Sequence, residues 1–206
     1  MKTRLTRSEL THGINHVRDK ARNDLDFVIS SLAAGAVAAL GFALDNVLLI
    51  AASIFLSPLM YPTVLLALTI SVGDTKGAFR SFLTLLTAML ATVVLAGLTY
   101  LFIGAGSGVL FFSQFFIPPV LHFFVAVAAG LIVTFTILWP TAQDAVWGGA
   151  LMVLFVPALA SLGVGIVLGA EAIMLTSLVL FALTFIGFLL GSIVAYALLR
   201  LVSNID

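Results

Sequence analysis

Two stretches of apolar sequence each carry a proline thirteen residues after an aspartate, with hydroxyl groups close by. The first runs from Asp45 to Pro58 and the second from Asp144 to Pro157. A proline inside a helix removes one backbone donor and clashes with the preceding turn, so it leaves carbonyl groups without their helical partners. In an apolar helix such carbonyls and the nearby hydroxyls can coordinate a small solute or ion. The pattern therefore indicates a binding site of the kind used in transport.

The residues expected to form this substrate-binding site carry a hydroxyl group or a helix-breaking ring, or lack a side chain. They are Ser53, Ser57, Pro58, Tyr61, Pro62, Thr63, Pro157, Ser161 and Gly163. If the two breaks meet at the middle of a membrane, they form a small polar site with helix ends directed at it. The alternative is an ordinary kink in each helix, with every hydroxyl bonded back to its own helix.

Between residues 27 and 200, acidic residues fall only at the ends of the long apolar stretches, as Asp45, Asp74, Asp144 and Glu171. We expect these four to act as helix caps or as a gate, and Asp45 and Asp144 to be N-caps of the helices that follow them. A proton relay needs ionisable groups inside the membrane. Because none lies at the centre of a stretch, the sequence argues against that mechanism.

Catalytic and metal-binding patterns are missing from the sequence. The chain has no cysteine and three histidines, two of which lie in the polar N-terminal segment. These residues cannot supply a thiol nucleophile or a catalytic zinc site. His122 is expected to be a lone histidine near one end of its apolar stretch. We therefore expect no enzymatic activity, no cofactor and no bound metal.

Composition places the chain in a lipid bilayer. Hydrophobic residues make up 62% of the chain and charged residues 9%, whereas soluble domains carry about 25% charged residues. A membrane-spanning helix needs about 20 apolar residues, and six stretches meet that length: 27–44, 47–70, 79–103, 118–139, 146–169 and 172–199. The sequence thus predicts an all-α polytopic membrane protein. Its zero net charge argues against a nucleic-acid partner.

The six predicted spans divide into two halves of three. Because three is an odd number, two tandem halves lie in the bilayer with opposite orientation, so the expected fold is a 3+3 inverted repeat with proline-broken second and fifth helices. The repeat is degenerate, since a glycine follows the first-half proline after 15 residues and the second-half proline after 12. A coincidence of two short matches is the alternative.

The expected domain boundaries follow from these spans. They are a cytoplasmic amphipathic helix on the membrane surface (1–25), a six-span membrane domain (26–200) with halves 26–103 and 118–200 and an outer interfacial segment (104–117), and a cytoplasmic tail (201–206). With six spans and a cytoplasmic N-terminus, all nine basic residues fall on the cytoplasmic side. That is the positive-inside pattern. We expect a multi-pass protein of the cell inner membrane with both termini in the cytoplasm.

A known family shares the first proline motif. The run Ser57-Pro58-Leu59-Met60-Tyr61-Pro62, followed by Gly73-Asp74, resembles a Ser/Ala-Pro-Leu-Met-Gly-Pro run and Gly-Asp loop of the bacterial and archaeal membrane family catalogued as domain of unknown function 389, or uncharacterised hydrophobic domain. Val156-Pro157-Ala158-Leu159-Ala160 is similar to a second, Val-Pro-Pro-Leu-Ala-like element of that family. The resemblance covers about residues 27–200 and implies the six-span architecture. Tyr61 and Ala158 replace a glycine and a proline of the family pattern, which would narrow or reshape a cavity.

Two functions fit these observations. The first is a small channel or transporter for a neutral solute or a lightly coordinated ion, because hydroxyls, carbonyls and helix ends suit such ligands. The alternative is a non-transporting oligomeric module that assembles or anchors partners, because small residues are dense in the first and sixth spans and permit close helix approach. Six spans in 206 residues leave little room for a wide pathway, so a homo-oligomer is expected in either case.

Overall fold

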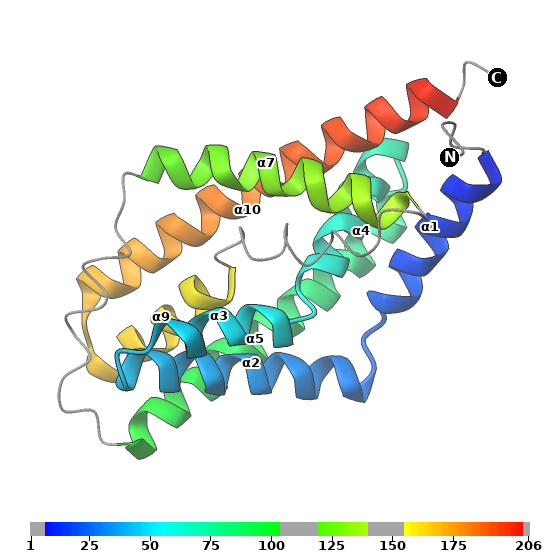
Figure 1. Cartoon of the computed structure of the whole chain (residues 1–206). Coiled ribbons are helices and arrows are strands. Elements are labelled where there is room, and N and C mark those ends of the chain that lie inside the picture. The colour runs from blue at the N-terminus through cyan, green and yellow to red at the C-terminus, as the bar shows by residue number, and fades with distance from the viewer. Residues whose placement is uncertain (1–6, 104–118, 140–154, 204–206) are drawn as a thin grey trace.

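The computed structural model describes residues 7–103, 119–139 and 155–203. Every regular element within these ranges is an α-helix, as Figure 1 shows with the labels used below. The helices are α1 (Arg7–Lys20), α2 (Leu25–Ala43), α3 (Val47–Leu56), α4 (Met60–Val72), α5 (Thr75–Ile103), α7 (Pro119–Leu138), α9 (Phe155–Leu168) and α10 (Glu171–Ser203). The predicted interfacial segment 104–117 lies outside the described residues, as does Asp144.

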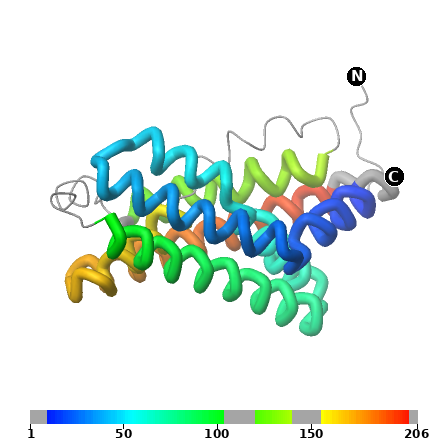
Figure 2. The backbone as a smooth tube through the Cα atoms, turned by 90° about the horizontal axis from the view of Figure 1, so that it is seen from below, coloured from blue at the N-terminus to red at the C-terminus, as the bar shows by residue number. Residues whose placement is uncertain are grey.

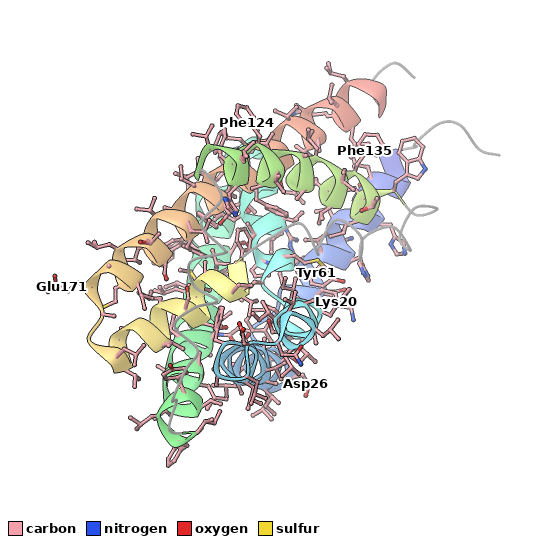
Figure 3. All side chains as sticks on the ribbon, turned by 60° about the vertical axis from the view of Figure 1, so that its left-hand side comes forward. Lys20, Asp26, Tyr61, Phe124, Phe135 and Glu171 are labelled. Carbon is pink, nitrogen blue, oxygen red and sulfur yellow. The ribbon has the colours of Figure 1, made fainter. Side chains whose placement is uncertain are left out.

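Four of these helices, α2, α5, α7 and α10, are long and apolar enough to cross a membrane. Helices α3 and α4 form an apolar pair bent at a short break, which is the geometry of either a broken span or a re-entrant loop. Large apolar side chains cover the outer faces of the bundle: Phe102 is 84% exposed and Phe124 is 63% exposed, and Figure 3 shows Phe124 projecting outward from α7. Apolar exposure on this scale is what a bilayer accommodates. The chain is therefore a helical membrane protein, as its composition predicts.

Helix α1 lies within the segment predicted to be an amphipathic helix, and its apolar side chains contact other helices. Its apolar residues Leu10 and Val17 are buried, and the helix packs against α4 and α7. A Cβ atom added at Gly13 would lie 3.0 Å from the Cα of Leu138, so the two helices approach closely there. The apolar face of α1 thus lies on the bundle instead of on lipid, and a non-helical turn separates α1 from α2.

Close helix crossings explain the density of small residues. In the first half α2 packs on α5, and in the second half α7 packs on α10. At Gly35 of α2 a Cβ would overlap the carbonyl oxygen of Thr92 on α5. At Gly191 of α10 it would overlap the carbonyl oxygen of Val127 on α7. Removing the side chain lets the two backbones touch, which is how membrane helices gain packing energy.

The two short helices α4 and α9 connect the halves. Helix α9 packs on α2, α3 and α5 of the first half as well as on α10, and α4 packs on α10 as well as on α5. Figure 2 shows α1, the corner between α4 and α5, and the last turns of α10 at one end of the molecule. The corner between α2 and α3 and the corner between α9 and α10 lie at the other end.

Candidate functional site

The first proline stretch contains a sharp break. Helix α3 ends at Leu56 and α4 begins at Met60, and the two axes are bent by 51°. Pro58 has no N–H to continue the helix. The backbone N–H of Ser57 donates to the Ile54 carbonyl at 3.3 Å, and the N–H of Leu59 donates to the Ser57 hydroxyl at 3.3 Å. The Ser57 hydroxyl therefore stabilises the break, because it accepts a hydrogen bond from a backbone N–H group there.

The other hydroxyls of this stretch bond back to their own helices. Ser53 Oγ donates to the Ile50 carbonyl at 2.6 Å, and Thr63 Oγ1 donates to the Leu59 carbonyl at 2.7 Å. Both side chains are fully buried. This is the arrangement expected of an ordinary kink. In the described state these two hydroxyls are occupied, and binding a solute would require them to turn away from the backbone.

The second stretch is described from Phe155 onward, so the residues before it lie outside the described part of the chain. Pro157 lies inside the described part of α9, and Pro62 lies in the first turn of α4. Both helices end at a glycine with positive φ, +74° at Gly73 and +63° at Gly169. Pro157 lies 12 residues before its glycine, whereas Pro62 and Pro58 lie 11 and 15 residues before theirs, so Pro157 is nearer in position to Pro62 than to Pro58.

Both short helices close with the same hydrogen-bond pattern. The N–H of Asp74 donates to the Thr69 carbonyl at 2.9 Å, and the N–H of Ala170 donates to the Gly165 carbonyl at 3.0 Å. Each bond spans five residues around a left-handed glycine, which is the Schellman C-cap. The two helices thus end in the same way, beyond the proline match seen in the sequence.

Ser161 joins two helices. Its Oγ lies 2.9 Å from the Ala158 carbonyl, to which it donates, and 2.6 Å from Ser177 Oγ on α10. Both serines are buried. Ser177 was not among the expected site residues. The sequence feature that could have pointed to Ser177 is its seven-residue spacing to Thr184. This spacing places two hydroxyls on one face of the sixth span.

Gly163 and Tyr61 each contact another helix, and this contact gives each residue a structural role. A Cβ at Gly163 would overlap the carbonyl oxygen of Val93 on α5, so Gly163 permits a helix crossing. The Tyr61 ring meets the ring of His16 on α1 edge to face, with centroids 6.4 Å apart. Figure 3 shows Tyr61 beside α1. Tyr61, which replaces a glycine of the family pattern, thus reaches across to α1, a contact that sequence inspection missed.

The acidic residues lie away from the break. The N-cap of α3 is Asn46, whose side chain accepts from the N–H groups of Leu48 and Leu49, so the expectation that Asp45 caps this helix is wrong. Asp45 instead takes a left-handed conformation with φ 51°. Asp74 does cap α5, since its Oδ1 accepts from the Gly77 N–H at 2.9 Å. Glu171 is exposed in the first turn of α10, where Figure 3 labels it.

Three buried polar atoms between α7 and α10 have no hydrogen-bond partner in the described part of the chain. They are His122 Nδ1, Thr134 Oγ1 and Ser192 Oγ. A Cβ at Gly130, one turn before Thr134, would lie 3.0 Å from the backbone nitrogen of Ser192. An unpaired hydroxyl in an apolar interior costs about 1–3 kcal/mol. Within the described residues no partner offsets this cost for the three groups.

The described residues offer hydroxyls, carbonyls and helix ends around the break between α3 and α4, and no set of three His, Cys, Asp or Glu side chains that could hold a metal ion. Comparison with known proteins gives one match. The family model described as Domain of unknown function (DUF389) matches residues 54–200. No curated protein and no solved structure matches the chain significantly. Because the match covers well over half of the sequence, this protein belongs to the Domain of unknown function (DUF389) family.

Proposed function

We propose that this protein is a small channel or transporter of the cell inner membrane, and not an enzyme. Its ligand is a small neutral solute or a lightly coordinated ion, held at the broken helices around Pro58 and Pro157. The observation that carries the proposal is the 51° break between α3 and α4 in the middle of an otherwise apolar span. Breaks of this kind in a membrane place backbone groups where they line a cavity or a binding site.

The inverted repeat belongs to this proposal, and equivalent contacts in the two halves support it. The carbonyl of Thr92 touches Gly35, and the carbonyl of Phe188 touches Gly130. Each carbonyl residue lies 19 positions after the terminal glycine of the half-helix that precedes it, 73 to 92 and 169 to 188. Each contact also joins the first and third spans of its half. Because α9 packs among first-half helices and α4 reaches α10, the half-helices interlock as inverted repeats do.

The proposed topology has six spans, with α3–α4 as the second and α9 as part of the fifth. Of the predicted fifth span, 146–169, the structure describes α9, whose 14 residues make about 21 Å of helix. With an even number of spans, both termini lie on one side, which we assign to the cytoplasm from the basic residues.

The buried hydroxyls shape the proposed mechanism. Ser53 and Thr63 are buried, which is consistent with an occluded state in the proposed cycle. Opening would turn these hydroxyls from their own carbonyls toward the solute. Thr134 and Ser192 in the other half, whose hydroxyls have no partner among the described residues, would offer further polar contacts to the solute.

The small-residue faces bear on the alternative of an assembly module. Gly35, Gly187 and Gly191 pack against other helices of the same chain, so they are not available to a partner. The features that suggested assembly therefore serve the fold of the single chain. Any homo-oligomer would form through the apolar outer faces, and chemical cross-linking in native membranes would detect it.

The test uses the natural absence of cysteine. Single cysteines at Ser53, Ser57, Thr63 and Ser161 face the interior, and matched controls at Phe55 and Ile166 face outward, where those side chains are 43% and 53% exposed. We expect membrane-impermeant thiol reagents to label the interior positions in intact cells, slowly and from one side at a time. The lipid-facing controls should stay unlabelled.

Complete protection of all interior positions, with labelling confined to helix-connecting loops, would mean a sealed core. That result would overturn the transport proposal and favour the assembly module. Equal labelling of interior and outward positions would show instead that the bundle does not exclude water at all.

A further inference from the structure

A cleft of about 700 Å³ lies at the end of the bundle where α1, α4 and α5 meet. Its walls are the last residues of α1 with the turn that follows, the second half of α4, and the first turns of α5. Four cations line it: Arg18 and Arg22 from the N-terminal segment, and Lys76 and Arg80 from α5. Lys76 and Arg80 are four residues apart and therefore share one face of their helix.

The cleft has an excess of positive charge. Its only lining carboxylates among the described residues are Asp19 and Asp74, and the Asp74 carboxylate already accepts a backbone N–H as the α5 cap. Arg22 pairs with Asp24 at 3.4 Å, with both side chains largely exposed. For the other three cations no ion pair occurs within the described ranges. The cleft thus carries cationic groups that an anion would neutralise.

Apolar side chains border the cationic wall. Leu83 lines the cleft and is 43% exposed. Phe79 and Phe82 lie on the adjoining face of α5 and are 63% and 46% exposed. These residues begin the stretch of α5 that faces the bilayer. An occupant therefore meets cations and apolar surface at once, which a lipid with a charged headgroup satisfies and a free anion does not.

We propose that this cleft binds the phosphate headgroup of an anionic lipid. The phosphate lies among Arg18, Lys76 and Arg80, and the acyl chains run along Phe79 and Phe82 into the bilayer. The cleft volume is within the range of about 300–1,000 Å³ of small-molecule sites, so it accommodates a whole headgroup. Because α1 and α5 both contribute cations, a bound lipid would also hold α1 against the bundle.

Native mass spectrometry of the purified full chain tests this proposal. The protein in detergent is titrated with phosphatidylglycerol or with phosphatidylcholine of the same acyl chains, and bound lipids are counted. We expect one phosphatidylglycerol to bind in preference to phosphatidylcholine. The variant pair Lys76→Gln with Arg80→Gln should weaken that binding about fivefold per cation, on the order of 25-fold in total.

The matched control pair is Lys20→Gln with Arg200→Gln, which removes two cations from the same end of the molecule outside the cleft. It should leave the preference within about twofold, the scale of a screened, non-specific attraction. Equal losses in the two pairs would show that the surface charge, and not the cleft, attracts the lipid, and would overturn the proposal.

Two further measurements keep the proposal testable. Inorganic phosphate in large excess should not displace the lipid; displacement would assign the cleft to a soluble phosphate instead. If the cleft variant does not fold, a photoactivatable phosphatidylglycerol is cross-linked to the unaltered protein. Cross-links in residues 76–84 are expected, and cross-links confined to other segments would rule the site out.

Discussion

The hydroxyl groups of this protein differ in what they connect. In an apolar interior a serine or threonine bonds to a carbonyl one turn earlier on its own helix, and Ser53 and Thr63 do so. Such a bond fixes one side chain and joins nothing else. The contact of Ser161 with Ser177, at 2.6 Å, joins α9 to α10. Bonds of this interhelical kind contribute about 0.6 kcal/mol on average in membrane proteins, and up to about 1.7 kcal/mol.

We therefore expect Ser177→Ala to lower the free energy of unfolding by about 0.6–1.7 kcal/mol. Ser53→Ala, which removes a bond within one helix, should have a smaller effect. The measurement is unfolding in mixed micelles, followed by circular dichroism. The double variant Ser161→Ala with Ser177→Ala should cost less than the sum of the single changes, and strict additivity would mean that the two hydroxyls do not interact.

The exchange of roles between Asp45 and Asn46 shows a limit of sequence inspection at this scale. Both residue types cap helices and both tolerate left-handed backbone conformations. The end of α2 needs a left-handed residue, and the chain path gives that place to Asp45 and the extended N-cap place to Asn46. Residue type alone does not distinguish two adjacent candidates, since backbone angles decide which of them is the cap.

At the scale of elements, the prolines at positions 58 and 62 act differently. Pro58 lies between α3 and α4, where it interrupts the helix. Pro62 is the third residue of α4, a position at which the backbone N–H has no helical partner in any case. A continuous helix would lack a hydrogen bond at both prolines, but in the bent span Pro62 removes no bond from α4, whereas Pro58 lies at the break itself. The bend should therefore depend on Pro58 more than on Pro62.

Pro58→Ala should straighten the α3–α4 span, reducing the 51° bend, and abolish transport while the protein still inserts. Pro62→Ala is the matched control and should keep both the bend and the activity. Electron-electron distance measurements between spin labels on α3 and α4 report the angle directly. An unchanged distance in the Pro58 variant would mean that tertiary packing, and not proline, imposes the bend.

Most helices were predictable, because a bilayer requires about 20 apolar residues per span and turn residues interrupt the sequence at that interval. The positions of α2, α5, α7 and α10 follow from this rule. The partners of each helix did not follow from it. The crossing of Gly97 with Gly163 and the docking of α1 on α4 depend on long-range packing, for which a single sequence carries only the density of small residues.

At the scale of the whole molecule, charge separates the two ends. Arg18, Lys76 and Arg200 lie at the end formed by α1, the α4–α5 corner and the last turns of α10 (Figures 1 and 2). At the opposite end the described corners carry Asp45 and Glu171 and no lysine or arginine. The spans that connect these ends are apolar, so the charges at the two ends determine the orientation in which the chain inserts. The positive-inside rule predicts that the basic end lies in the cytoplasm.

This asymmetry leads to the last prediction, which concerns orientation. Asn23 and Glu171 are both exposed and lie at opposite ends of the bundle. In spheroplasts, an impermeant maleimide should label the Glu171→Cys variant at once and the Asn23→Cys variant only after permeabilisation, while both should react in detergent. The reverse pattern would place the basic end outside. Partial labelling of both variants would mean that the chain inserts in two orientations. The charge difference between the two ends would then favour one orientation without determining it.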